Sequence, residues 1–281
     1  MTGSGLRRRV LGVLVAAALT GAVACTDHRA RPVPAHLTAA LRRAERATDG
    51  ADSARVRSTT SLGTQMSLRA DGTLGWGDGL TGAFTLAYTG GTALDTMRRL
   101  GSTSMETRYL PDAYYARMGD AFAAQTGGKH WIRYGYAEVD GLDQVRDTTP
   151  DQAVKLLLAA GDLKRVGAER VGAVDTTHYA GTVAVADLAE RHTGLATRER
   201  DALREQLTRA GVTKERVEIW VDGRDLLVKK VEKGETASGA YSQTAHYSDY
   251  GVKVSVARPP AGDTGDFKDL TTGRSAAPDG G

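Results

Sequence analysis

Short segments of alternating apolar and polar residues, placed in neighbouring pairs along the chain, constrain the fold of this 281-residue sequence more than any other feature. A period of two is typical of strands that bury one face of a sheet. The strongest hairpin signal is Asp222-Gly223, inside the alternating residues 217–232. Asp71-Gly72 predicts a second hairpin within residues 67–76. Further strands are predicted at residues 82–90, 104–118, 130–136, 163–172, 176–186, 240–247 and 251–260.

Helical periodicity is found in only a few segments. Residues 36–50 carry an apolar stripe, and residues 149–161 begin with Thr149-Pro150, which suits the first turn of a helix. Residues 197–211 form a third helical segment that ends at a glycine. About eleven strands in adjacent pairs, with few helical crossovers, predict an α+β fold built on an antiparallel sheet.

The amino terminus has the layout of a secretory signal. A basic stretch, "MTGSGLRRR", precedes the apolar "VLGVLVAAALT" and the small residues "GAVA". The only cysteine, Cys25, follows directly, so an intrachain disulfide is impossible. The residues before it resemble a lipobox, which implies that Cys25 becomes the mature terminus and carries a diacylglyceryl anchor. An ordinary signal peptide with an incidental cysteine is the alternative, and Arg7-Arg8 leaves Sec and twin-arginine export both open.

Charge and composition divide the rest of the chain. Without residues 1–24, Lys plus Arg falls from 37 to 34 and equals the 34 Asp plus Glu, which argues against a nucleic-acid partner. Residues 25–36 are polar with two prolines and are predicted to form an extended, lipidated tether. Residues 37–260 are predicted to form a single domain. Residues 261–281, rich in Gly, Asp and Thr, are predicted to be a disordered tail.

No catalytic or metal-binding pattern emerges. "GDGLTG", residues 77–82, matches GxGxxG, but a strand-like segment follows it where a nucleotide site needs a helix. The six histidines lack metal-ligand spacing, and His178 and His246 are predicted to face solvent. Glu232 belongs to a charged segment with Lys230 that is predicted to be a solvated strand edge. We therefore expect no cofactor, no metal ion and no enzymatic activity.

Aromatic residues gather in one part of the chain. Between residues 109 and 136, six of them lie on three predicted strands. Two interpretations remain open, because these side chains could fill an ordinary sheet core or line a cavity. The six are Tyr109, Tyr114, Tyr115, Trp131, Tyr134 and Tyr136.

Several segments resemble a known family. "THYAGTVAVADL", "EIWVDGRDLLVKKVEKGE" and "TAHYSDYGVKVSVARPP" are similar, in this order, to the second half of actinobacterial LppX/LprG-type lipoproteins of the LolA/LolB-like superfamily. "DAYYARMGDAFAAQTGGKHWIRYG" resembles a strand pair of the first half. The resemblance implies a strongly curved antiparallel sheet, a half-barrel wrapped around helices. It also implies an apolar cavity between sheet and helices that takes the acyl chains of lipids or glycolipids.

The combined expectation is a lipoprotein on the extracytoplasmic face of the cell membrane, anchored through Cys25. It would bind a lipid or glycolipid, carry it across the envelope and exchange it with an envelope transporter. The alternative is a surface interaction or sensor protein of the same fold with a packed interior. An error of one residue in the alternation would place a side chain on the opposite face. The predicted cavity lining is Phe84, Leu86, Tyr115, Trp131, Leu156, Leu157, Val183, Val185, Ile219 and Val221.

Overall fold

One mixed sheet of twelve strands organises the residues that the computed structural model describes, which are 33–138, 149–189, 195–209, 211–236 and 239–270. They belong to one unit, which begins at Pro32. The strands are β1 (Ser53–Leu62), β2 (Met66–Gly75), β3 (Thr81–Gly90), β4 (Ser104–Leu110), β5 (Ala113–Arg117), β6 (Trp131–Gly135), β7 (Lys164–Val171), β8 (Val174–Ala184), β9 (Lys214–Asp222), β10 (Leu227–Thr236), β11 (Gly239–Ser248) and β12 (Thr264–Asp266).

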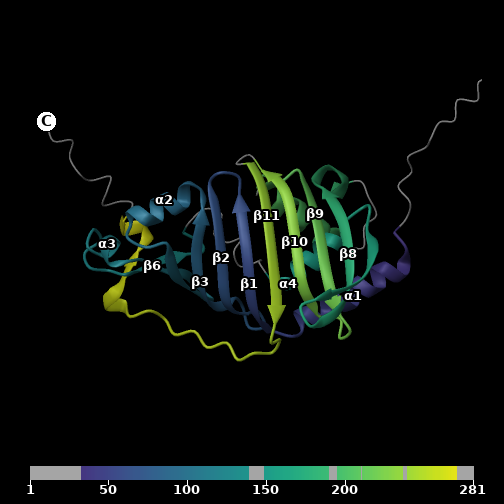
Figure 1. Cartoon of the computed structure of the whole chain (residues 1–281), viewed down its shortest axis with the longest axis horizontal. Helices are drawn as coiled ribbons and strands as arrows, with labels where there is room; N and C mark the ends of the chain where they lie inside the picture. The colour runs from purple at the N-terminus through teal and green to yellow at the C-terminus, as the bar shows by residue number, and fades with distance from the viewer. Residues whose placement is uncertain (1–32, 139–148, 190–194, 210, 237–238, 271–281) are drawn as a thin grey trace, which may run out of the picture. The chain divides into compact units, whose positions relative to one another are not determined.

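The strand order across the sheet is β12-β6-β5-β4-β3-β2-β1-β11-β10-β9-β8-β7. Only β12 and β6 are parallel neighbours, so the prediction of an antiparallel α+β sheet is confirmed, with one short strand added. At the centre, β1 and β11 lie side by side although they come from opposite ends of the described chain (Figure 1). The order does not return on itself, which leaves the sheet open at β12 and β7.

The helices α1 (Ala35–Asp49), α4 (Pro150–Leu158) and α5 (Thr197–Arg209) correspond to the three predicted helical segments. Two short helices, α2 (Gly91–Arg99) and α3 (Asp120–Ala123), were not predicted. Thr149 precedes α4 in extended conformation and Pro150 opens it, as the sequence pattern indicated. Among the described helices, none is long and apolar enough to cross a membrane.

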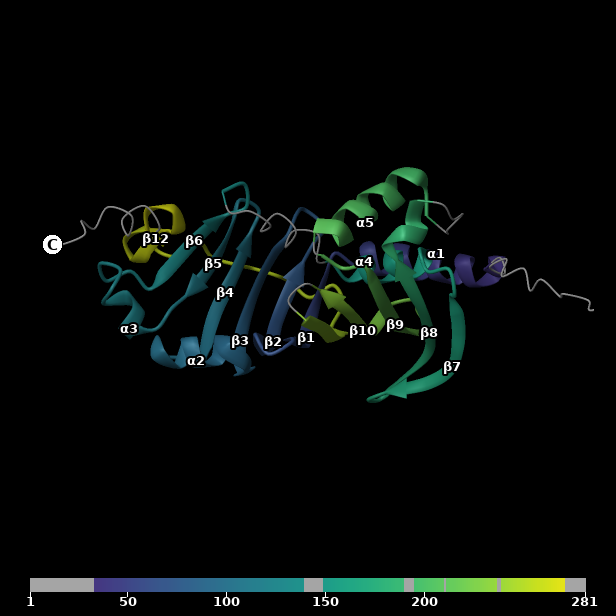
Figure 2. The same ribbon diagram turned by 90° about the horizontal axis from the view of Figure 1, so that it is seen from above.

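The main core lies on one face of the sheet, which we call the helix-covered face. Helix α4 packs on β8, β9 and β10, and α1 packs on α4. Figure 2 shows the curved sheet with α1, α4 and α5 on the same side. Leu41, Val154, Leu157, Val217 and Ile219 are fully buried here. Complete burial of one such side chain contributes about 1.5–3 kcal/mol, so this half of the sheet is held by ordinary close packing.

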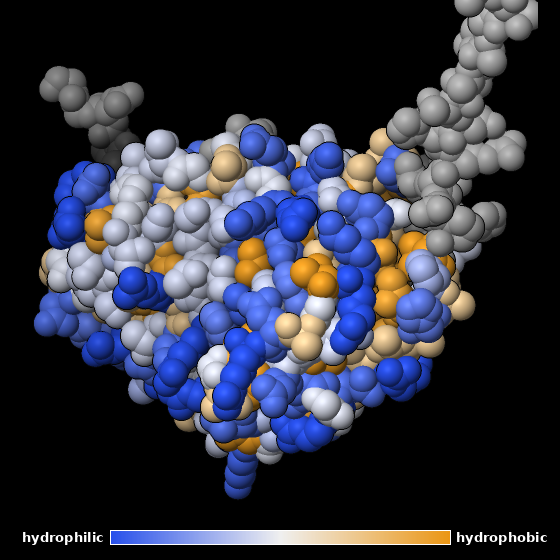
Figure 3. Space-filling view, turned by 45° about the vertical axis from the view of Figure 1, so that its right-hand side comes forward, coloured by the Kyte–Doolittle hydropathy of each residue, from blue (hydrophilic) through white to orange (hydrophobic). Residues whose placement is uncertain are grey.

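The opposite face, which we call the helix-free face, is polar, and hydrophilic side chains dominate the part of it seen in Figure 3. Edge strand β7 turns toward this side (Figure 2) and helps to bury His178. The His178 ring stacks on Trp220 at 4.1 Å and lies between Glu169 at 3.3 Å and Glu218 at 2.9 Å. The prediction that His178 faces solvent is therefore wrong, because β7 supplies a carboxylate over it. His246 is exposed, as predicted.

Three strand predictions need correction. Asp71-Gly72 lies in the middle of β2, and the turn between β1 and β2 falls at residues 63–65. Central strand β1 was not predicted at all. Residues 251–260 keep the predicted alternation, with Val252, Val254 and Val256 half-buried, but they form no ladder with another strand.

Residues 251–260 form a strap that connects β11 to β12 and is visible along the lower edge of Figure 1. Val256 packs against Leu110, Ala113, Tyr115 and Trp131 on the helix-free face. The ordered chain then continues past residue 260 to residue 270, although a disordered tail was predicted from residue 261. Carboxylates hold this continuation to β6.

Two side-chain contacts fix β12: Asp263 Oδ1 lies 2.7 Å from His130 Nδ1, and Asp266 forms an ion pair with Arg133, with 2.9 Å between Oδ2 and Nη1. The His130 backbone N–H also donates to Asp263. These contacts therefore order a segment whose Gly and Asp content is typical of disorder.

Candidate functional site: an aromatic row and a buried charged cluster

A row of aromatic rings crosses the helix-covered face of β3, β4, β5 and β6. Phe84 meets Tyr109 edge-on at 5.7 Å, Tyr109 meets Tyr114 at 5.1 Å, and Tyr114 meets Tyr134 at 5.7 Å between ring centroids. Phe267, which follows β12, extends the row at 4.8 Å from Tyr134. Each such contact adds about 0.5–1.5 kcal/mol to simple burial, so the row forms a continuous apolar surface.

Burial perturbs the phenols of this row. Loss of solvent raises the pKa of Tyr109 to about 12, with a smaller contribution from Tyr88. Burial also holds the pKa of Tyr114 well above its usual value of 10.0. These hydroxyls remain neutral at physiological pH, which suits a surface that contacts hydrocarbon.

The row belongs to a larger surface that the helices do not fully cover. On β1 to β6, many apolar side chains of the helix-covered face are only half-buried. The residues over β2 are small, since Ala70 and Gly72 lie between the larger Leu68 and Leu74. We call this set the half-buried apolar face: Leu62, Leu68, Ala70, Phe84, Leu86, Tyr88, Met105, Tyr109, Tyr114 and Tyr134.

The predicted lining residues divide into three groups. Phe84 and Leu86 belong to the half-buried apolar face. A second group lies in the packed core beneath α4 and close to it, where native side chains already fill the space. This group contains Leu156, Leu157, Val183, Val185, Ile219 and Val221.

Tyr115 and Trp131 form the third group and lie on the helix-free face. They pack with Leu110, Ala113 and the strap, and Trp131 stacks under the Arg108 guanidinium at 4.4 Å. Tyr114 and Ile132, their neighbours in the chain, occupy the helix-covered face. The predicted alternation in β5 and β6 was therefore shifted by one residue. A shift of one residue places each side chain on the opposite face of the sheet.

Charged side chains interrupt the apolar character at the centre of the helix-covered face. Lys230 Nζ lies 2.8 Å from Glu232 Oε2, and the two side chains are only 13% and 6% exposed. Burial favours loss of the Lys230 charge, yet the negative charge of Glu232 outweighs it and raises the pKa of Lys230. Glu215 and Tyr241 complete what we call the buried charged cluster.

The sequence pattern concealed this cluster. A register shift between Leu227 and Lys229 in β10 places Lys230 opposite Ile219 and Glu232 opposite Val217. Ile219 and Val217 are both core residues. Without this bulge, the alternation that starts at Leu227 would turn Val231 to the core, and Lys230 and Glu232 would face solvent. The prediction of a solvated edge at Glu232 is therefore wrong, and the bulge is its physical cause.

Glu215 gives a testable pH dependence. Its burial, together with the charge of Glu232, raises its pKa from 4.5 to about 8. Between these values the folded chain holds a proton that the unfolded chain releases, so stability falls as pH rises toward 8. Glu215→Gln is expected to flatten this decline, which urea unfolding at about pH 5 and about pH 8 would measure. Glu106→Gln, an exposed change, is the control, and a slope unaltered by Glu215→Gln would contradict the assignment.

Within the described residues, no group of three His, Cys, Asp or Glu side chains is placed to hold a metal ion. Cys25, the predicted lipid-attachment residue, lies outside the described residues. The half-buried apolar face and the buried charged cluster beside it are the candidate sites in the part of the chain that the structure describes.

Comparison with known proteins supplies the family. The chain is 49% identical to "Putative lipoprotein SCO4650" of Streptomyces coelicolor over 305 aligned residues, which cover 96% of this chain and 98% of that protein. The chain belongs to this family of streptomycete lipoproteins. A second family member, "Uncharacterized 31.2 kDa protein in rplA-rplJ intergenic region" of Streptomyces griseus, is also 49% identical and covers 85% of this chain and 82% of its own length. No protein-family profile matches the chain.

Solved structures show that this lipoprotein family shares the fold implied by the sequence resemblance. Lipoprotein LppX of Mycobacterium tuberculosis superposes with a TM-score of 0.52 at 16% identity, covering 80% of this chain and 100% of LppX. LprF of Mycobacterium bovis gives a TM-score of 0.51 at 14% identity, covering 81% of this chain and 99% of LprF. The prediction of a strongly curved sheet around helices, a fold shared with these two lipoproteins, is confirmed.

Proposed function

We propose that this lipoprotein shelters an acyl chain of a lipid or glycolipid on its half-buried apolar face. It does so while anchored through Cys25 on the extracytoplasmic side of the membrane. The observation that supports this most directly is the aromatic row with its half-buried apolar neighbours, on a face that α1, α4 and α5 cover only in part. In this role the protein binds its ligand and catalyses no reaction.

The energetics favour a carrier that works with partners. Removing a sixteen-carbon chain such as palmitate from water is worth on the order of 10 kcal/mol. The same chain gains almost nothing when it leaves a bilayer, because lipid tails are already apolar. Transfer across the envelope therefore needs a donor and an acceptor, and an envelope transporter is one suitable partner.

A second candidate function follows from the packed core. Leu157, Val183 and Ile219 are almost completely buried, so native side chains fill the space around them beneath α4. If the half-buried apolar face is also closed to lipid, the protein acts through its loops and surfaces as an interaction or sensor lipoprotein.

Two matched substitutions test the acyl-chain site in the full chain carrying Cys25→Ser, which prevents acylation. Ala70→Trp places an indole on the half-buried apolar face of β2, and Ala240→Trp places one on the helix-free face of β11. We expect Ala70→Trp to weaken binding of a fluorescent fatty acid by at least about tenfold, a loss of about 1.4 kcal/mol, since the indole occupies the site of the chain. Ala240→Trp should leave the affinity within about twofold of the parent.

Lipids extracted from the same protein and identified by mass spectrometry provide a second measurement. Lipid recovered in stoichiometric amount from the parent and lost from Ala70→Trp supports the carrier. Absence of lipid, together with no binding of the fluorescent fatty acid, would reject the carrier and favour the interaction protein.

A further inference from the structure

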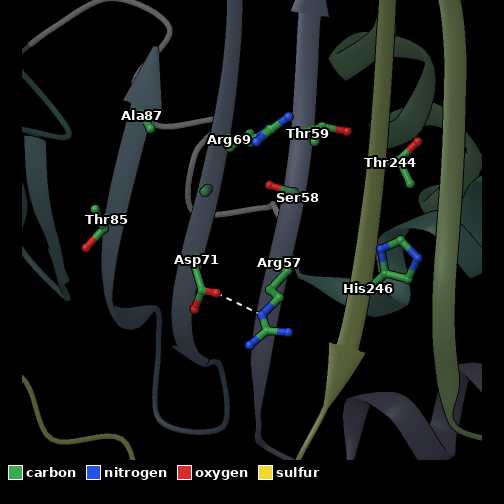
Figure 4. Close-up of a pocket in the computed structure, with 10 residues that line it drawn as sticks. Arg57, Ser58, Thr59, Arg69, Asp71, Thr85, Ala87, Thr244 and His246 are labelled. Carbon is green, nitrogen blue, oxygen red and sulfur yellow. Dashed lines mark hydrogen bonds and ion pairs between the residues drawn. The ribbon is translucent and has the colours of Figure 1, made fainter. Parts of the chain in front are cut away.

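A hollow of about 340 Å³ lies on the helix-free face, where β3, β2, β1 and β11 run side by side (Figure 4). Short side chains create it, because Thr59 and Ala87 flank Arg69 on the two neighbouring strands and Thr244 flanks Thr59. Ligand sites begin at about 300 Å³, so the hollow has room for a small polar molecule or for one group of a larger molecule. It is separated from the half-buried apolar face by the thickness of the sheet.

Positive charge is in excess around this hollow. Asp71 Oδ1 accepts from Arg55 and its Oδ2 accepts from Arg57, each at 2.8 Å, so a single carboxylate serves two guanidinium groups. No described residue forms an ion pair with Arg69, which extends from β2 toward Thr59 (Figure 4). Arg57 contacts Asp71 through Nε alone and keeps its terminal nitrogens available.

The pKa of His246, at the β11 side of the hollow, reflects the same excess of positive charge. Partial burial lowers its pKa below 6.5, and the positive charge of Lys229 lowers it further. Lys229 is its cross-strand neighbour on β10, and Arg57 is its neighbour on β1. Asp71 is the only carboxylate among the described residues of the lining, so an added anion would meet the two cationic side chains of Arg57 and Arg69 and little repulsion.

We propose that this hollow binds a phosphate ester, held by the guanidinium groups of Arg57 and Arg69. Arg57 pairs with Asp71, and Thr59 pairs with Arg69, so the two arginines lie on a diagonal of adjacent strands, about 7–8 Å apart at their bases. In Figure 4 the two exposed side chains extend in opposite directions, so both guanidinium groups must rotate toward the hollow to share one ligand. Their forked N–H donors then suit a tetrahedral phosphate, which accepts hydrogen bonds from several sides. The hydroxyls of Thr59 and Thr244 supply further donors to the same group.

The phosphate ester could be a soluble molecule or a lipid headgroup at a membrane surface, and two probes separate these sources. Glycerol 3-phosphate represents the soluble ester. Vesicles containing phosphatidylglycerol, compared with pure phosphatidylcholine vesicles, represent the headgroup. Both are added to the full chain carrying Cys25→Ser, and the ring signals of His246 are followed by NMR as a function of pH.

Arg69→Gln is the test variant, and Arg216→Gln is its control. Arg216 lies outside the lining of the hollow and pairs with Glu218 at 2.9 Å. A bound phosphate ester should shift the His246 signals saturably and raise the pKa of His246. Arg69→Gln should weaken binding at least about tenfold, and Arg216→Gln by less than about twofold.

Response to both probes, or to glycerol 3-phosphate alone, supports a site for the ester itself. Response to phosphatidylglycerol vesicles alone supports the same chemistry and assigns it to a lipid headgroup. The proposal is overturned if neither probe shifts His246. It is also overturned if both variants weaken binding equally, because diffuse surface charge would then explain the attraction.

Discussion

Replacing Lys230 by methionine is expected to destabilise the fold by about 3–5 kcal/mol. The substitution leaves Glu232 buried without its partner, and Glu215 lies in the same cluster. Breaking a buried ion pair from one side costs far more than the pair itself contributes, because an uncompensated charge remains in a poorly solvated place. Urea unfolding at neutral pH, followed by far-UV circular dichroism, measures the loss.

The double variant Lys230→Met with Glu232→Leu separates the charge effect from a loss of packing. We expect it to recover most of the lost stability, since two apolar side chains of similar volume replace the pair. If the double variant were as unstable as Lys230→Met alone, shape rather than charge would dominate the site. A loss below about 1 kcal/mol in the single variant would place Lys230 in contact with water and contradict its burial.

Gly72→Ala is the second substitution with a large expected effect, and we expect a loss of about 3 kcal/mol or more. A Cβ added at Gly72 would collide with the carbonyl oxygen of Ala83 and lie 2.7 Å from the ring of Phe84. The colliding oxygen is backbone, so relief requires β2 and β3 to move apart. That movement would also displace Phe84, the first ring of the aromatic row.

Gly223→Ala is the matched control for this change. Nothing lies within 4 Å of a Cβ added at Gly223, in the turn between β9 and β10, and we expect its stability to stay within about 0.5 kcal/mol of the parent. Thermal and urea unfolding of the two variants side by side measure the difference. Equal, small effects would show that β2 and β3 yield easily at this position.

These two glycines also show how far the sequence specifies the fold. Both follow an aspartate inside an alternating segment, and both were predicted to turn the chain. Only Asp222-Gly223 does so, and even there the residue in the left-handed region is Asp225, with a φ of 64°. Gly72 serves a different purpose, since it leaves room for an aromatic ring from the next strand. That requirement arises between strands and leaves no local signal.

The missed and misplaced segments have physical explanations of the same kind. Strand β1 is rich in Arg, Ser and Thr, which weakens its apolar pattern although it is a central strand. The strap at 251–260 has the pattern of a strand, but it packs by its valines without joining the ladder. The segment after Pro260 is ordered through His130 and Arg133, which lie far away in the sequence.

The candidate site was predictable in character but not in position. Alternation correctly placed Phe84 and Leu86 on the helix-covered face, and it reversed the two faces at Tyr115 and Trp131. In β5 and β6 both faces carry aromatic residues, so the pattern could not choose between them. The charged cluster was hidden by one bulge in β10, a feature that depends on its pairing with β9.

The adjacency of β1 and β11 has a consequence for biogenesis. The two central strands, β1 and β11, are the first and the last of the long strands along the chain. They pair from Arg55 with Ser248 to Leu62 with Tyr241. A nascent polypeptide therefore carries a bare inner edge on β1 until Ser248 has emerged, and such edges recruit other chains. Closing so wide a span also slows folding. A factor that binds exposed strand edges therefore has the longest time to act between the synthesis of β1 and that of β11.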